Sequence, residues 1–139
     1  MSEIFVLDTS SILAFTDEED GCEEVEQLLD AARKKECFVE ISSMSLLEVY
    51  YLVLREQGED KAAELIAIIK SWPVNFVYPD EKILLQAGKL KAFYKLSVAD
   101  ALISATAKLH HATLVHKDPE LLALADEVTL MTLPLKVKS

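Results

Sequence analysis

Four carboxylates are the side chains of this sequence best suited to chemistry, because all of them stand at the same kind of structural position. Each lies just past a strand-like run or in the first turn of a predicted helix. In a parallel sheet these positions share one edge, where ligands bind. Carboxylates gathered there repel one another, and hard divalent cations such as Mg²⁺ or Mn²⁺ relieve that repulsion. The candidates are Asp8, Glu48, Asp100 and Asp118.

Each acid also has an ordinary structural explanation. Asp8 is typical of a turn or helix N-cap, and Asp118, which precedes a proline, is typical of an N-cap. The segments 45–48 (SLLE) and 97–100 (SVAD) both match a capping box, in which the acid reaches back to the amide of the serine. Asp100, however, lies in an otherwise apolar string, where an acid needs a partner or a metal. It is the joint placement of the four acids that favours a metal site.

The chain alternates between short apolar runs and segments with helical spacing. This alternation predicts a parallel sheet with helices on both faces. We expect an α/β fold in which residues 1–139 form one domain, a three-layer α/β/α sandwich around a central, mostly parallel sheet of about five strands. The predicted strands cover 4–8, 37–42, 74–78, 113–116 and, at an edge, 128–133. The predicted helices cover 11–15, 22–35, 45–54 opened by Ser45, a segment from its cap Asp60 to Pro73, 80–95 capped by Asp80, 98–110 capped by Ser97, and a segment opened by Asp118 and Pro119.

Composition narrows the class of protein. Of 139 residues 51% are hydrophobic, and the mean hydropathy of +0.20 provides enough apolar material for a core. The apolar runs are too short to span a bilayer, and the start of the chain lacks the pattern of a secretory signal. We therefore expect a cytoplasmic protein without membrane association. Cys22 and Cys37 match no zinc motif and are expected to remain reduced.

Four motifs, in order along nearly the whole chain, resemble those of the PIN-domain ribonucleases and, in size, the VapC-type toxins of toxin–antitoxin pairs. The segment 97–107 is the most specific of them. The resemblance implies Mg²⁺ or Mn²⁺ as cofactor, RNA as substrate, a homodimer, and an antitoxin partner if the protein is a toxin. One position departs from the pattern, because His116 stands where family members often have threonine. The motifs are 6–10 (VLDTS), 45–49 (SLLEV), 97–107 (SVADALISATA) and 114–118 (LVHKD).

The resemblance implies that all four acids are metal-site residues and that Ser10 supports the first of them, and we add a role for each acid as a hypothesis. Asp8 and Asp100 would be the main metal ligands, and Ser10 would support Asp8. Glu48 would bind or orient the attacking water, while Asp118 would complete a second, weaker site. A coordinated water with a lowered pKa would attack the phosphorus, leaving a 5′-phosphate and a 3′-hydroxyl. His116 would either touch the metal or the substrate or, as the favoured interpretation, be a strand-end residue without a chemical role.

Charge is the main objection to a nuclease. With 14 basic and 24 acidic residues the net charge is −10, which repels nucleic acid. Two Mg²⁺ ions add four charges and bring the total to about −6. Lysines near the acids would supply a basic rim, although ordinary solvated charges explain them equally well. The lysines are Lys89, Lys91, Lys95 and Lys117.

Other interpretations remain open at this stage. Phe93 and Tyr94 would stack on bases, although core packing better explains at least one of them. The chain would instead be a non-catalytic PIN-like protein-interaction module if the acids served only as caps. A housekeeping RNA-processing nuclease would have the same site but no antitoxin. Stabilisation by Mn²⁺ separates a metal site from simple caps.

Overall fold

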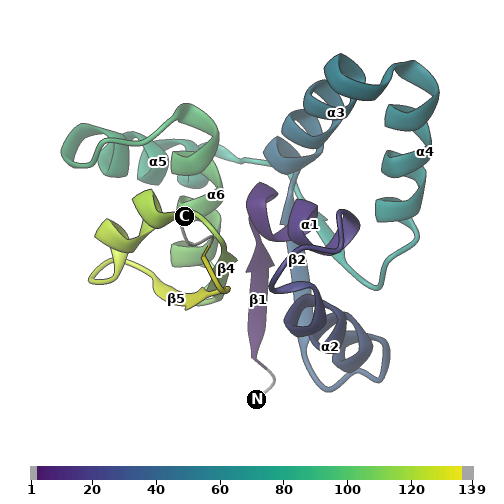
Figure 1. The fold of residues 1–139 in the computed structure, drawn as a ribbon. Helices are drawn as coiled ribbons and strands as arrows, with labels where there is room; N and C mark the ends of the chain where they lie inside the picture. The colour runs from purple at the N-terminus through teal and green to yellow at the C-terminus, as the bar shows by residue number, and fades with distance from the viewer. Residues whose placement is uncertain (1–2, 136–139) are drawn as a thin grey trace.

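A computed structural model describes residues 3–135, which form a sheet of five strands with helices packed around it (Figure 1). The strand order is β3-β2-β1-β4-β5, and every neighbouring pair is parallel. The α/β prediction with a parallel sheet is therefore confirmed, including the edge position of the last strand. The strands are β1 (Ile4–Leu7), β2 (Phe38–Ser42), β3 (Asn75–Val77), β4 (Thr113–His116) and β5 (Thr129–Thr132).

The helices cover both faces of the sheet, as predicted. Consecutive strand residues point to opposite faces. Val6 and Leu114 accordingly pack in one core cluster with α5 and α6, whereas Leu7 and Val115 pack in a second cluster with α1–α4. All four side chains are fully buried, which explains why the strands are continuous apolar runs. The helices are α1 (Thr9–Thr16), α2 (Cys22–Arg33), α3 (Ser43–Gln57), α4 (Glu59–Lys70), α5 (Glu81–Phe93), α6 (Val98–Leu109) and the 3-10 helix η1 (Pro119–Leu124).

Two predicted helix caps are wrong. The helix that we expected to open at Ser45 begins at Ser43, because the hydroxyl of Ser42 accepts the amide of Met44 at 3.2 Å and caps the helix. The next helix is capped by Gly58 and not by Asp60. Gly58 has φ +91° and alone separates α3 from α4, so that the chain reverses at the one residue type that adopts this angle without strain.

The helical segment that follows β4 is not a regular α-helix. The segment opened by Asp118 and Pro119 is a 3-10 helix, closed by a bond of 3.1 Å from the amide of Leu121 to the carbonyl of Asp118. The caps predicted at Asp80 and Ser97 are confirmed, since their side chains accept the amides of Ile83 and Asp100. None of the helices within residues 3–135 combines the length and apolar character needed to cross a membrane.

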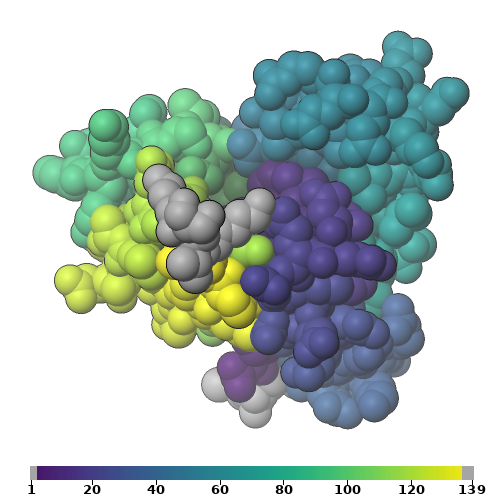
Figure 2. Space-filling view, in the orientation of Figure 1, coloured from purple at the N-terminus to yellow at the C-terminus, as the bar shows by residue number. Residues whose placement is uncertain are grey.

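The four candidate acids follow the carboxyl ends of the strands or lie in the helices that begin there. The strand β1 lies at the centre, and α1 follows it after the single residue Asp8, while α3 follows β2 directly. The helix α6 contacts α3 as well as β1, β2 and β4. In Figure 1, α1 and the ends of α3 and α6 surround the top of β1, and Figure 2 shows the purple surface of this first segment between the teal α3–α4 side and the green α5–α6 side.

Candidate metal centre

Asp8 is the most buried of the four acids, with only 3% of the residue exposed. It caps α1, because its Oδ1 accepts the amide of Ser11 at 2.8 Å. The Ser10 hydroxyl lies 2.8 Å from both carboxylate oxygens, which agrees with the supporting role expected of Ser10. Burial raises the pKa of Asp8 to about 7, despite these hydrogen bonds, and the negative charge of Asp100 adds to the rise.

Glu48 is held by a contact that is distant in sequence. The Thr9 hydroxyl donates a hydrogen bond of 2.6 Å to Oε1 of Glu48 and lies 3.3 Å from the Ser45 hydroxyl. Since α3 begins before Ser45, the capping-box explanation of Glu48 is wrong. Its carboxylate instead joins the first turn of α1 to the first half of α3.

Asp100 lies in the first turn of α6, where the Ser97 hydroxyl accepts its amide at 3.0 Å. Its pKa is raised, first by burial and then by the negative charges of Glu48 and Asp118. Asp100 therefore interacts electrostatically with each of the other three acids. The helix continues as seven buried residues from 101 to 107, so that the position of this carboxylate is fixed by the core.

Asp118 has the cap role expected for it, since its Oδ1 accepts the amide of Glu120 at 2.9 Å. Its own amide donates to Nδ1 of His116 at 3.1 Å. His116 is fully buried, and burial lowers the pKa of its imidazole, which favours the neutral ring. Both the ordinary explanation and the placement beside Asp100 therefore hold for Asp118.

The structure places Asp8, Glu48 and Asp118 within electrostatic reach of Asp100, but the four acids do not form a closed cluster. Asp100 interacts with Asp8, Glu48 and Asp118. Among residues 3–135, no three acidic, histidine or cysteine side chains are already arranged to hold a metal. The donor set fits Mg²⁺ or Mn²⁺, because it consists of carboxylate oxygens only. Asp8, Glu48 and Asp118 use oxygens in hydrogen bonds to serine, threonine or backbone donors, and Asp100 interacts with the side chain of Ser97.

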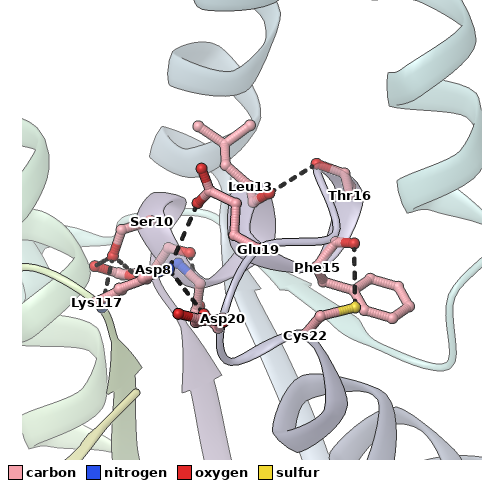
Figure 3. A network of polar contacts seen from close by, with 10 residues as sticks. Asp8, Ser10, Leu13, Phe15, Thr16, Glu19, Asp20, Cys22 and Lys117 are labelled. Carbon is pink, nitrogen blue, oxygen red and sulfur yellow. Dashed lines mark hydrogen bonds and ion pairs between the residues drawn. The ribbon is translucent and has the colours of Figure 1, made fainter. Parts of the chain in front are cut away.

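The predicted basic rim is smaller than expected. Lys117 has a side chain only 7% exposed, donates to the carbonyl of Asp20 at 2.8 Å and pairs with Glu19 at 3.7 Å (Figure 3). Lys91 donates to the carbonyl of Leu96 at 2.9 Å. The ammonium groups of these two lysines bind backbone carbonyls, and of the four predicted rim lysines Lys89, Lys91 and Lys95 are exposed residues.

Of the two aromatic residues before α6, one packs against the core, as expected, and the other is exposed. Tyr94 packs against the core and donates its hydroxyl to Glu127 at 3.0 Å. Phe93 is 84% exposed.

Sequence reasoning missed Thr9 and the contacts of His116. Thr9 belongs to an unbroken run of hydroxyl residues after Asp8, and such a run in a first helical turn is a signal for more than one polar contact. The partner of Thr9 lies 39 residues away, and one partner of His116 lies 16 residues away on β5. No local pattern indicates either pair.

Comparisons with known proteins agree with this architecture. A chain of the crystal structure of VapBC2 from Rickettsia felis, bound to a DNA fragment from its promoter, has 20% identity and a TM-score of 0.76, with 94% of this chain and 99% of that chain covered. DNA-bound VapBC from Salmonella typhimurium gives 16% identity and a TM-score of 0.74, with coverages of 95% and 98%. VapC20 of Mycobacterium tuberculosis, a toxin that cleaves the sarcin-ricin loop, gives 24% and 0.70, with coverages of 95% and 100%.

These similarities show a shared fold, since all the identities are below 25%. No curated protein matches the sequence. The family model of the PIN domain matches residues 5–127, which is most of the chain. The alternation of strands and helices, the parallel sheet and this match lead to one conclusion: the chain belongs to the PIN-domain family.

Proposed function

We propose that this protein is a Mg²⁺- or Mn²⁺-dependent endoribonuclease whose site consists of Asp8, Glu48, Asp100 and Asp118. The observation that carries the proposal is the electrostatic interaction of Asp100 with the other three acids. Holding like charges together is unfavourable, and a divalent cation turns this cost into binding free energy. Caps alone do not require the acids to lie near one another.

The residues divide the chemistry among them. Asp8 and Asp100 would hold the cation, and Asp118 would complete a weaker second position. When bound, the metal supplies Lewis-acid stabilisation of phosphoryl oxygens and a lowered pKa for water. Glu48, oriented by Thr9, positions the attacking water. Attack on phosphorus breaks the bond to O3′ and leaves a 5′-phosphate and a 3′-hydroxyl.

The partners follow from the same family. We infer that the protein acts in the cytoplasm on RNA, as a homodimer, and as the toxin of a toxin–antitoxin pair. Matching structures include VapBC assemblies and a VapC toxin that cleaves the sarcin-ricin loop, which supports this choice over a housekeeping nuclease. Co-purification with the product of an adjacent small gene tests the antitoxin, and light scattering after size-exclusion chromatography tests the dimer.

The test of the activity compares Asp8→Asn with a matched control, Asp30→Asn. Both substitutions remove one negative charge at nearly constant size, but Asp30 is an exposed residue of α2 paired with Arg33. The purified proteins are incubated with structured RNA in Mg²⁺ or Mn²⁺. We expect wild type and Asp30→Asn to cleave, and Asp8→Asn to lose cleavage. Equal cleavage by Asp8→Asn and wild type contradicts the mechanism.

A non-catalytic module makes a different prediction in the absence of RNA. A metal site gains thermal stability from millimolar Mn²⁺ in proportion to binding, whereas capping acids do not. A melting temperature of wild type that is unchanged by Mn²⁺ favours the module.

A further inference from the structure

The imidazole of His116 is fully buried and has a partner at each nitrogen. Its Nδ1 faces the amide of Asp118 at 3.1 Å, and its Nε2 lies 2.8 Å from the hydroxyl of Thr132 on β5. A backbone amide can only donate, so Nδ1 must accept. The ring is therefore the neutral tautomer with its proton on Nε2, and it donates that proton to Thr132.

This ring belongs to a turn that is held by further hydrogen bonds of its backbone. The amide of Lys117 donates to the Ser10 hydroxyl at 2.8 Å, and the carbonyl of His116 accepts the amide of Leu133 at 2.8 Å. Ser10 in turn donates to the Asp8 carboxylate (Figure 3). The turn between β4 and η1 thus touches two of the four acids: it contains Asp118, and it reaches Asp8 through Ser10.

We propose that His116 is a positioning residue of the metal site, which orients Asp118 by accepting its amide and keeps the adjacent Lys117 amide directed at the Ser10 hydroxyl, which in turn donates to Asp8. The inference rests on the proposed function. A threonine at this position would offer one hydroxyl to the amide two residues on, as in an ST-turn. The histidine serves the same amide and also ties the turn to the edge strand β5.

Two substitutions separate the nitrogens. In His116→Asn, the side-chain oxygen occupies nearly the position of Nδ1, which keeps an acceptor for Asp118 and loses the contact with Thr132. In His116→Gln, the terminal amide nitrogen reaches the place of Nε2, which keeps the contact with Thr132 and loses the acceptor for Asp118. Each variant loses one buried hydrogen bond, so a purely structural role predicts equal effects. Their melting temperatures provide the comparison of folding.

The probes are Mn²⁺ alone, by titration calorimetry, and hydrogen exchange of the Asp118 amide. We expect His116→Asn to bind Mn²⁺ within about twofold of wild type with a protected amide. We expect His116→Gln to bind it about tenfold more weakly with an exchanging amide, as for other residues that orient metal ligands. Equal Mn²⁺ affinities of the two variants overturn the inference, whether both match wild type or both are weakened. Failure of wild type itself to bind Mn²⁺ contradicts the proposed function and, with it, the role assigned here.

Discussion

Metal-free Asp8→Asn should be more stable than metal-free wild type at neutral and alkaline pH, although it removes a residue of the proposed site. In the absence of a cation, wild type must keep a buried carboxylate ionised beside Asp100. Asparagine keeps the oxygen that accepts the amide of Ser11 and carries no charge. The variant therefore removes an unfavourable buried charge without leaving the helix α1 uncapped.

The sign follows from the direction of the pKa shift. The pKa of Asp8 rises from 3.8 to about 7 on folding, so the folded state binds the proton more tightly than the unfolded chain. The contribution of Asp8 to the free energy of unfolding is fully present below pH 3.8 and is lost as the pH rises to about 7. The rise of this pKa from 3.8 to about 7 corresponds to a loss of about 4 kcal/mol in the free energy of unfolding above that range. Between about pH 4.5 and about pH 8, wild type should lose about 3 kcal/mol that the variant retains.

Urea unfolding in EDTA at several pH values measures this difference, with Asp30→Asn as the control for an exposed charge. The quantity to compare is the change with pH in the free energy of unfolding of each variant relative to wild type, because any constant offset from altered hydrogen bonds cancels. A difference between Asp8→Asn and wild type that stays flat from acid to alkaline pH would refute the assignment of a buried, destabilising carboxylate at this position.

Three further substitutions test the supports of the site and the core. Thr9→Val removes the donor to Glu48 and should lower the free energy of unfolding by about 1.5–3 kcal/mol, the contribution of a hydrogen bond to a charged group; it should also lower RNA cleavage about tenfold, measured as kcat, because Glu48 is no longer oriented. Gly21→Ala should cost about 2 kcal/mol of unfolding free energy in urea, because φ is +102° and a Cβ would lie 3.0 Å from Leu133. Leu114→Ala empties a fully buried position and should cost about 3 kcal/mol in the same assay; a loss below about 1 kcal/mol contradicts the packing described for β4.

The parts of the fold that sequence predicts well are those with two independent local signals. For α6, the cap at Ser97 and the apolar string that follows agree, and the structure has both. The prediction for the start of α3 was wrong because the local signals there are ambiguous. Serines at positions 42, 43 and 45 all suit a cap. Ser42 is the cap in the structure because β2 ends at this residue, which the local sequence does not indicate.

The site was predictable in outline but not in its contacts. Strand ends next to helix starts placed the acids at one edge, since that follows from the parallel sheet alone. The Thr9–Glu48 bond depends on how α1 packs against α3, and the His116–Thr132 bond depends on the register of β4 and β5. The contacts of Lys91 and Lys117 were not predictable for the same reason, because the positions of the carbonyls that accept from them are set by tertiary structure.

Anomalous diffraction from crystals soaked in Mn²⁺ tests most directly whether the four acids share a cation. We predict a manganese peak coordinated by the carboxylates of Asp8 and Asp100, with Glu48 and Asp118 turned toward it, and no such peak in Asp8→Asn crystals. Manganese bound only elsewhere on the protein, or equal peaks in the wild-type and Asp8→Asn crystals, would contradict the account.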